Sequence, residues 1–434
     1  MQTEWQTRSL DECLESEFPG EWGDTPASRP ANALVLRSTN LDDEGHVDLA
    51  GAAPRVVPRS KLAAKRLREG DILLEASGGG PGKPVGRVAL FQPDSASDYL
   101  ASNFFRTLRP DPKVAVPAFL TWRLQHLWRS PRIWTYQQQT TGITNLNVRE
   151  YLSSEFEMPP CPEQSCVAAI LDTLDETIRR SRDLIAKLKL IKQGLLRDLL
   201  TRGIDHTGRL RPAPATAPHA YQHSTAGLIP AEWETSTFGE QVEFRGGFGF
   251  SDRFQGLAQG DLPFFKVSDM SKAGNEKLLQ KANNYVSRTT ASRQGWSPAP
   301  PGGVAFAKVG AALLLNRRRI LSSDSLVDNN MMVAVAGPSL DPTWLYWWLQ
   351  TVDFGAFVQP GALPSVNQGQ LGSLQIAYPD LREQRTIATV LDTSDSRIAS
   401  ERQGFDKLRA LKSGLLEDLL SGRVSVSVPD EGLV

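Results

Sequence analysis

The sequence predicts a mixed α/β (α+β) protein with an internal repeat, in which two similar globular domains are separated by two long helices that pair as a coiled coil. Three observations predict this fold: a duplicated segment, a heptad pattern of apolar residues in both copies, and Gly- and Pro-rich regions with short apolar runs before each copy. The length of 434 residues also exceeds one ordinary core and favours several domains.

The duplicated segment is the most informative feature of the sequence. Residues 162–203 align without a gap with residues 382–423, at a constant offset of 220, and nearly half of the aligned positions are identical. A weaker similarity extends into the regions that precede the two segments, where Asn147 and Asn367 again lie 220 residues apart. We interpret these asparagines as turn or capping residues. The chain is therefore two copies of one unit, each a globular domain followed by a helix.

Both copies carry an apolar stripe with a period of 3.5 residues, the pattern by which two helices bury a shared seam. In the first copy the helix-pairing residues are Val167, Leu171, Leu174, Ile178, Ile185, Leu188, Leu195 and Leu199. In the second copy they are Ile387, Leu391, Ile398, Phe405, Leu408, Leu415 and Leu419. Each helix is expected to run about 33 residues, or about 50 Å. Alternatively, each helix packs only on its own domain.

Four polar residues interrupt this seam: Ser181, Lys192, Glu401 and Lys412. Polar seam residues can fix the register of a helix pair.

We place the domain boundaries as follows: a first globular domain at 1–158, a helix at 159–208, a Pro- and Ala-rich linker at 209–227, a second globular domain at 228–378, a helix at 379–426 and a tail at 427–434.

Composition excludes several classes of protein. The three cysteines, Cys13, Cys161 and Cys166, cannot form a disulfide framework, and no Cys/His cluster has zinc spacing, so no metal site is expected. No apolar run is long enough for a membrane span, and a cytoplasmic protein is expected. The net charge of −1 leaves three alternatives: no DNA binding, locally concentrated basic residues, or partner subunits that supply the phosphate contacts.

Several motifs are candidates for contacts with DNA. The Gly-rich stretch at 77–87 fails the Walker pattern because Ser77 and Pro84 replace required residues. It is instead expected to be a loop from which Lys83 and Arg87 reach DNA, or alternatively a solvated turn. The amides of Gln137, Gln138 and Gln139 suit adenine edges, unless this segment is only a polar loop.

The second domain offers a cluster of cations at Arg317, Arg318 and Arg319, with Lys266 and Lys308 as weaker candidates. Arginine can pair with both guanine acceptors or bind phosphates, although such a run is often only a solvated face. The tryptophans at helical spacing, Trp122, Trp128, Trp134, Trp344, Trp347 and Trp348, are expected in the core. No Asn-Pro-Pro-aromatic or Gly-x-Gly-x-x-Gly motif occurs, and no catalytic residue is expected.

Four segments carry a resemblance to a known family: "PPCPEQ" at 159–164, "ILDTLDETI" at 170–178, "KQGLLRDLLTRGID" at 192–205, and "GDILLEASGGGPGKPVGRVALF" at 70–91. With them the chain resembles, over nearly its whole length, the specificity subunits of type I restriction-modification systems. The resemblance implies that residues 1–158 and 228–378 are target-recognition domains. It also implies that the two helices pair antiparallel, which relates the domains by a pseudo-twofold axis and makes helix length a ruler for the spacer.

The resemblance further implies a non-catalytic subunit that recognises an asymmetric bipartite target in double-stranded DNA. Its implied partners are two modification (adenine-N6 methyltransferase) subunits and restriction subunits. The chain itself needs no cofactor, while S-adenosylmethionine, ATP and magnesium are expected in the partner subunits. Two alternatives remain: a coiled-coil scaffold that does not read DNA, which the near-neutral charge favours, and an enzyme in its own right.

Overall fold

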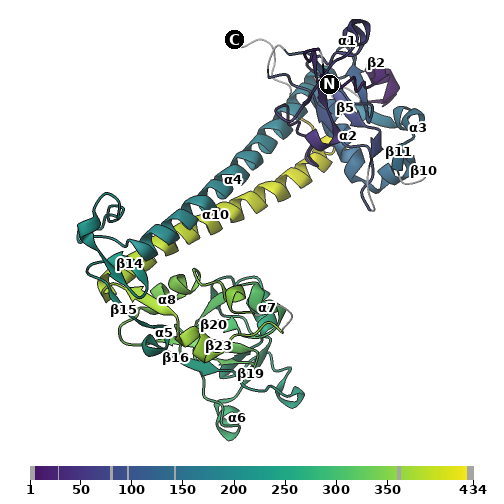
Figure 1. The fold of residues 1–434 in the computed structure, drawn as a ribbon. Coiled ribbons are helices and arrows are strands. Elements are labelled where there is room, and N and C mark those ends of the chain that lie inside the picture. Colours follow the sequence, from purple (N-terminus) through teal and green to yellow (C-terminus); the bar gives the residue numbers. More distant parts are fainter. Residues whose placement is uncertain are drawn as a thin grey trace. The chain divides into compact units, whose positions relative to one another are not determined.

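The computed structural model describes residues 5–27, 29–78, 82–94, 97–140, 143–358 and 363–427. The chain divides into two compact units, which we describe separately: residues 1–182 with 404–434, and residues 183–403. Each unit joins one globular domain to part of each of two long helices, α4 (Cys161–Thr201) and α10 (Leu381–Leu420) (Figure 1). The predicted mixed α/β fold with two domains and two long helices is confirmed.

The long helices contain 41 and 40 residues, more than the 33 expected. The apolar stripe underestimates them because it begins at Val167 and Ile387, after a polar first turn in each helix. Pro162 is compatible with the start of α4, since an amide donor is not needed in the first turn. Each helix is followed by a glycine with positive φ, Gly203 (62°) and Gly422 (72°), which is the common left-handed helix end.

The first domain is built on a four-stranded antiparallel sheet of order β2-β9-β5-β7. These strands are β2 (Leu14–Pro19), β5 (Ile72–Glu75), β7 (Val88–Leu90) and β9 (Phe105–Pro110). Helix α2 (Pro117–Arg129) covers one face, and the core between them also includes Leu171 of α4 and Leu419 of α10. The domain core is therefore continuous with the start of α4 and the end of α10.

Two three-stranded sheets and a strand pair complete the first domain, with orders β4-β3-β8, β10-β11-β6 and β1-β12. Their strands are β1 (Gln6–Ser9), β3 (Ala33–Leu36), β4 (Ala53–Arg55), β6 (Ser77–Gly78), β8 (Tyr99–Ala101), β10 (Gln137–Thr140), β11 (Ile143–Leu146) and β12 (Glu155–Met158). The short helices are η1 (Asp11–Cys13), η2 (Ser38–Asn40), α1 (Arg59–Lys65), η3 (Pro131–Tyr136) and α3 (Val148–Leu152).

The second domain repeats most of this topology and adds β18 as a fifth strand of the main sheet. Its main sheet has the order β16-β23-β20-β21-β18, its smaller sheet is β19-β17-β22, and β15 pairs with β24 as β1 pairs with β12. The strands are β15 (Glu234–Thr237), β16 (Val242–Gly246), β17 (Leu262–Phe265), β18 (Leu278–Leu279), β19 (Asn284–Val286), β20 (Val304–Ala307), β21 (Arg318–Leu321), β22 (Leu326–Val327), β23 (Met331–Ala336) and β24 (Gln375–Tyr378).

The helices of the second domain follow the same plan, since α8 (Pro342–Leu349) corresponds to α2 and α9 (Gln368–Gly372) to α3. The others are α5 (Phe238–Gln241), η5 (Asp252–Phe254), η6 (Val267–Ser271), α6 (Arg288–Arg293), α7 (Ala311–Leu314) and η7 (Phe354–Phe357). Asn147 and Asn367 are the N-caps of α3 and α9, and each side chain accepts a bond from a backbone N–H. Their predicted capping role is confirmed.

The segment expected to be a linker, 209–227, is packed against the second domain. It contains η4 (Pro218–Ala220), β13 (Tyr221–Ser224) and the start of β14 (Gly227–Pro230), and β13 pairs with β14. The buried side chain of Arg211 binds both carboxylate oxygens of Glu383 at the start of α10, at 2.5 and 2.9 Å. The Pro-rich composition predicted a flexible linker, but the segment is fixed to the second domain because this ion pair holds it in place.

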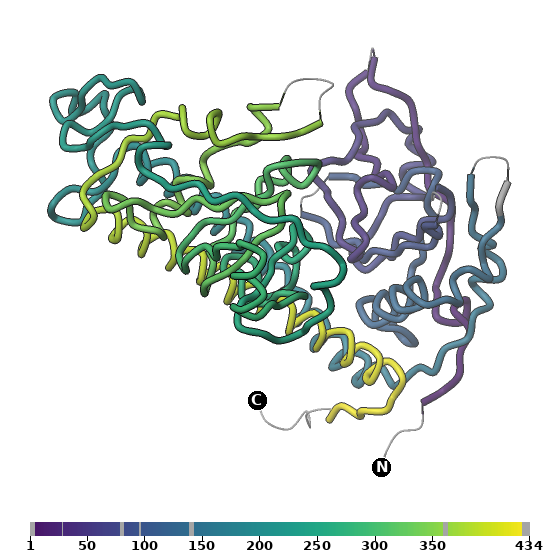
Figure 2. The backbone as a smooth tube through the Cα atoms, turned by 90° about the horizontal axis from the view of Figure 1, so that it is seen from below, coloured from purple at the N-terminus to yellow at the C-terminus, as the bar shows by residue number. Residues whose placement is uncertain are grey.

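The long helices run antiparallel in each unit. In the first unit, Leu171 near the start of α4 shares a core with Leu416 and Leu419 near the end of α10. In the second, Leu199 near the end of α4 shares a core with Ile387 and Leu391 near the start of α10. The two helices lie side by side in both views of the chain (Figures 1 and 2). All fifteen residues predicted to pair the helices are buried or half-buried.

Candidate nucleic-acid interface

Arg87, a predicted DNA contact, lies in a buried ion pair. Its Nε and Nη2 atoms donate to the two carboxylate oxygens of Glu75 at 2.8 and 2.7 Å, and its Nη groups also donate to the carbonyls of Leu41 and Ser38. The hydrogen bonds to Glu75 raise the pKa of Arg87 against the opposing effect of burial. Because these bonds occupy the guanidinium donors, Arg87 fixes a loop onto β5, and its expected contact with DNA is corrected to this structural role.

Lys83 lies in the same loop but faces solvent. Its Nζ atom donates to both carboxylate oxygens of Asp43, at 2.7 and 3.0 Å, and its side chain is 48% exposed. An exposed ion pair of this kind contributes little to stability. The ammonium group can therefore exchange this carboxylate for a phosphate, and Lys83 remains a candidate contact.

The glutamines of β10 differ from one another in their surroundings. The side-chain amide of Gln137 is bound within the domain. It accepts from the backbone N–H of Val85 at 3.0 Å and donates to the carbonyls of Val85 and Ile133. The DNA contact expected of Gln137 is therefore corrected. Gln138 is exposed on the hairpin opposite Asn145 and stays a candidate. The side chain of Gln139 lies outside the described part of the structure.

The arginine cluster of the second domain is largely internal. Arg318 is 1% exposed, its guanidinium lies 3.9 Å from the ring centre of Phe354, and it donates to the carbonyls of Asn316 and Val352. Burial lowers its pKa to about 10. Because the group is inaccessible, the expected DNA contact of Arg318 is corrected to a role in the core.

The neighbouring arginines bind the same domain in different ways. Arg319 donates to the carbonyls of Arg318 and Met270, and burial lowers its pKa, so its expected DNA contact is also corrected. Arg317 is half-buried and donates to the hydroxyl of Ser271. Lys266 donates to the side-chain carbonyl of Gln255 at 2.6 Å. Lys308 is half-buried, and its backbone joins Asn330 and Val366. Of these residues, Arg317, Lys266 and Lys308 remain candidates.

A cluster that we name the helix clasp joins each domain to both long helices. In the first unit, the indole N–H of Trp122 in α2 donates to Asp172 of α4 at 2.8 Å. One turn further along α4, Asp175 accepts from Lys412 of α10, whose Nζ atom lies 4.5 Å from the ring centre of Trp122. Three elements therefore meet around one tryptophan.

The helix clasp of the second unit has the same composition. Trp347 of α8 donates to Asp392 of α10 at 2.6 Å, and Asp395 accepts from Lys192 of α4, which lies 4.8 Å from the ring centre of Trp347. The two aspartates and the lysine each lie 220 residues from their counterparts in the other helix clasp. Lys192 and Lys412, predicted as polar interruptions of the seam, thus bind the opposite helix and specify the antiparallel register.

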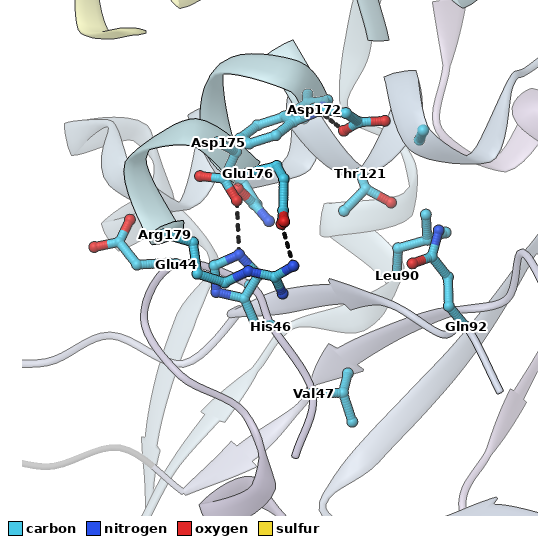
Figure 3. A pocket seen from close by; sticks show the side chains of 14 residues that line it. Glu44, His46, Val47, Leu90, Gln92, Thr121, Asp172, Asp175, Glu176 and Arg179 are labelled. Carbon is cyan, nitrogen blue, oxygen red and sulfur yellow. Dashed lines mark hydrogen bonds and ion pairs between the residues drawn. The ribbon is translucent and has the colours of Figure 1, made fainter. Parts of the chain in front are cut away.

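The first unit has an additional anchor at His46, a residue that the sequence did not single out. The ring of His46 bonds to Asp42 at 3.0 Å. Its other nitrogen bonds to Asp175 at 2.6 Å and thereby ties a loop of the domain to α4 (Figure 3). His46 and Asp175 border a cavity of about 340 Å³ that Thr121, Asp172 and Arg179 also line. The four-residue spacing of Asp42 and His46 was the one available signal in the sequence. In the second unit, Lys277 anchors the domain by binding Asp392 at 2.5 Å.

The stability of the first unit is expected to fall between pH 6.5 and pH 9. The hydrogen bonds to Asp175 and Asp42 raise the pKa of His46 from 6.5 to about 9. Because the pKa of His46 is higher in the folded than in the unfolded state, the protonated ring stabilises the fold by up to about 3 kcal/mol at pH values below the unfolded pKa. This contribution is lost as the pH rises through the folded pKa. Thermal unfolding at pH 6 and pH 9.5 measures the effect. His46→Gln should remove most of the difference, whereas a change at the exposed His206 should not; equal pH dependence in both variants would contradict this assignment.

The other predicted features were placed as follows. Trp122, Trp344 and Trp347 are buried and Trp128 and Trp348 are half-buried, as expected, but Trp134 is 50% exposed because the adjacent Ile133 takes the core position. Within the described ranges, no group of His, Cys, Asp and Glu side chains is placed to hold a metal ion. No helix in the part of the chain that the structure describes is long and apolar enough to cross a membrane.

The first domain also carries a run of cations that was not predicted as a contact with DNA. Residues 55–68 contain Arg55, Arg59, Lys61, Lys65, Arg66 and Arg68 but no aspartate or glutamate. A count of charges along the chain would have found this run, because it contrasts with the net charge of −1. The six cations lie on α1 and its flanking segments, at the surface of the first domain.

Comparisons with known proteins agree on one family. Residues 230–409 match the family model described as the type I restriction modification DNA specificity domain. The chain is 22% identical, over 98% of its length and 94% of the relative, to a protein of Methanocaldococcus jannaschii described as a specificity subunit of the type I restriction enzyme MjaX. It is 19% identical to the MjaVIII specificity subunit of the same organism over 67% of each chain.

Solved structures show the same fold. The crystal structure of a type I restriction-modification S subunit from M. genitalium superposes with a TM-score of 0.57 at 15% identity and covers 96% of each chain. A chain from a study of complex assembly in a type I R-M system superposes with a TM-score of 0.51 at 16% identity, over 97% of this chain and 98% of that one. With its repeated domains, paired helices and matching sequence, this chain is similar over nearly its whole length to the specificity subunits of type I restriction-modification systems.

Proposed function

We propose that this chain is the sequence-specific DNA-binding subunit of a type I restriction-modification complex and recognises an asymmetric bipartite target. The observation that carries the proposal is that the chain contains two domains of similar fold, each joined to the long helices by a helix clasp. The two domains carry different side chains on their surfaces. Equivalent supports present two reading surfaces, and unlike surfaces read unlike half-sites. The paired helices then set the length of the non-specific spacer between the half-sites.

The proposal assigns the chemistry to other subunits. Two adenine-N6 methyltransferase subunits bind this chain, and restriction subunits join them for cleavage. S-adenosylmethionine, ATP and magnesium act in those partners, and this chain contributes no catalytic residue. Support for two equivalent partner sites comes from the long helices, where Ile191 and its repeat equivalent Leu411 are both more than half exposed although both are large and apolar. Isolated apolar residues are common on surfaces, but an equivalent pair suits two copies of one partner.

The methylated sites of a host that expresses this chain with its methyltransferase provide the test. We expect one motif with two different half-sites that are separated by a spacer of fixed length and free sequence. Expression of the methyltransferase without this chain is the control and should leave the motif unmethylated. Active expression that methylates no split motif would refute the proposal.

A scaffold that joins proteins without reading DNA is the second candidate. It is favoured by the burial or internal bonding of Arg87, Gln137, Arg318 and Arg319, which leaves few of the expected contacts free. A gel shift of the assembled complex at several salt concentrations separates the two functions. Preference for the methylated motif over a scrambled duplex supports DNA recognition, whereas equal affinity supports the scaffold.

A further inference from the structure

The cations of residues 55–68 gather on a helix that adds little to the core. No residue of α1 is buried, and its apolar contact is the half-buried Leu62, which packs against a small cluster of Ala33, Val35, Val57 and Leu100. The packing of α1 therefore gives no reason for six cations in this segment. A surface role explains them better.

Only part of this positive charge is neutralised within the domain. Lys61 and Lys65 share the carboxylate of Glu21, at 3.0 and 3.2 Å, and Arg66 binds Asp98 at 3.0 Å. Two carboxylates thus serve three cations. Arg59 and Arg68 are exposed, and among the described residues neither has a carboxylate within ion-pair distance.

Arg55 is a third cation of this segment without a carboxylate partner among the described residues. Its guanidinium lies 4.0 Å from the ring centre of Trp22 and donates to the hydroxyl of Thr25 at 2.9 Å. Stacking on an aromatic ring restricts a guanidinium while leaving its charge uncompensated. We name Arg55, Arg59 and Arg68 the α1 surface; it presents three positive charges with no carboxylate partner in the part of the domain that the structure describes.

The equivalent position of the second domain carries fewer cations, with two arginines on α6. Helix α6 follows β19 as α1 follows β4, because β19 and β4 occupy the same place in their three-stranded sheets. Arg288 of α6 binds Asp324 at 3.0 Å, and its backbone N–H donates to Asp261. Arg293, the other arginine of α6, is exposed and has no carboxylate within ion-pair distance among the described residues. The uncompensated charge at this position is therefore one arginine in the second domain and three in the first.

Building on the proposed function, we propose that the α1 surface binds the phosphate backbone of DNA at the half-site read by the first domain. The equivalent position of the second domain carries less uncompensated charge, so the two half-sites contribute unequally to the salt dependence of binding. Phosphate contacts require only accessible positive charge, and they carry most of the salt dependence of binding. A membrane surface is disfavoured, because none of the described residues at 53–68 is a large exposed apolar side chain that could insert.

The test uses the assembled complex and measures its affinity for target and scrambled duplexes between 50 and 200 mM salt. The double variant Arg59→Ala/Arg68→Ala should reduce the slope of log K against log salt by about 1.8, since each phosphate contact contributes about 0.9. The ratio of affinities between the two salt concentrations should then shrink about twelvefold. Preference for the target over the scrambled duplex should persist, because phosphates carry no sequence information.

Matched variants show whether the loss of positive charge causes the change in the salt slope. Arg59→Lys/Arg68→Lys should keep the wild-type slope because the charges remain, and Lys113→Ala, which removes an exposed cation of the same domain outside the α1 surface, should also keep it. An unchanged slope in the alanine double variant overturns the inference, and so does a loss of sequence preference at an unchanged slope. If the wild-type complex showed no sequence preference but the slope still fell, the phosphate contact would stand and the proposed function would fail.

Discussion

Replacement of Asp175 by alanine is expected to destabilise the first unit by about 3–5 kcal/mol, the usual cost of leaving a buried charge without its partner. Asp175 is 15% exposed and accepts from two cations, Lys412 and His46, so its loss leaves both without their shared carboxylate. Burial opposes the charge of Asp175, but the hydrogen bonds from His46 and Lys412 prevail and lower its pKa. Chemical unfolding followed by tryptophan fluorescence measures the loss.

The second helix clasp supplies the control for this prediction. Asp395→Ala removes the equivalent carboxylate, but Asp395 and Lys192 are 32% and 25% exposed, so solvent screens the unpaired lysine. We expect a loss of about 1 kcal/mol. A second check is Asp175→Leu/Lys412→Leu, which removes the charges of both partners and should recover part of the stability. Equal losses for Asp175→Ala and Asp395→Ala would show that burial does not set the strength of these ion pairs.

Truncation of the helix seam is expected to loosen each unit separately. Leu171 and Leu391 are repeat equivalents, both are 0% exposed, and each lies in the core that one domain shares with the long helices. Leu→Ala at such a site removes the buried methyl groups and leaves a cavity, which together cost about 2–5 kcal/mol. Hydrogen–deuterium exchange should therefore accelerate in β5 for Leu171→Ala and in β20 for Leu391→Ala.

An exposed leucine of the same helix is the matched control. Leu190 is 67% exposed on α4, so Leu190→Ala should change stability by less than about 0.5 kcal/mol and leave exchange unchanged. The account is contradicted if Leu171→Ala and Leu391→Ala accelerate exchange equally in both domains, because each leucine would then support more than its own unit.

The fold was predictable because its information is local and periodic. A heptad pattern of apolar residues predicts one face of a helix, and the gapless repeat gives the same pattern twice. The stripe positions from Val167 to Leu419, which are buried or half-buried in the structure, could therefore be located from the sequence. Helix length was underestimated because the polar first turns carry no stripe. The residues Lys192 and Lys412 were noticed, but their partners lie 203 and 237 residues away, and no local pattern connects them.

The candidate site was less predictable because residue type does not reveal a partner. Arg87 and Arg318 have the chemistry to bind DNA, yet Glu75 in a buried strand and the carbonyl of Val352 occupy them. Glu75 ends the otherwise apolar strand β5, and a carboxylate in that position indicates a nearby cation. The burial of Arg318 depends on Phe354, which only the folded chain places against it.

The most direct test of the central claim replaces residues 234–378 by a second copy of residues 6–158. These boundaries are equivalent, because the pairing of β1 with β12 closes the first domain before α4 and the pairing of β15 with β24 closes the second domain before α10. The methylated motif of this variant is then compared with that of the wild-type complex. If two independent reading domains are held by an antiparallel pair of helices, one wild-type half-site should appear at both ends of the motif, as an inverted repeat. A motif that keeps both original half-sites, or repeats one of them in the same direction, would contradict the account.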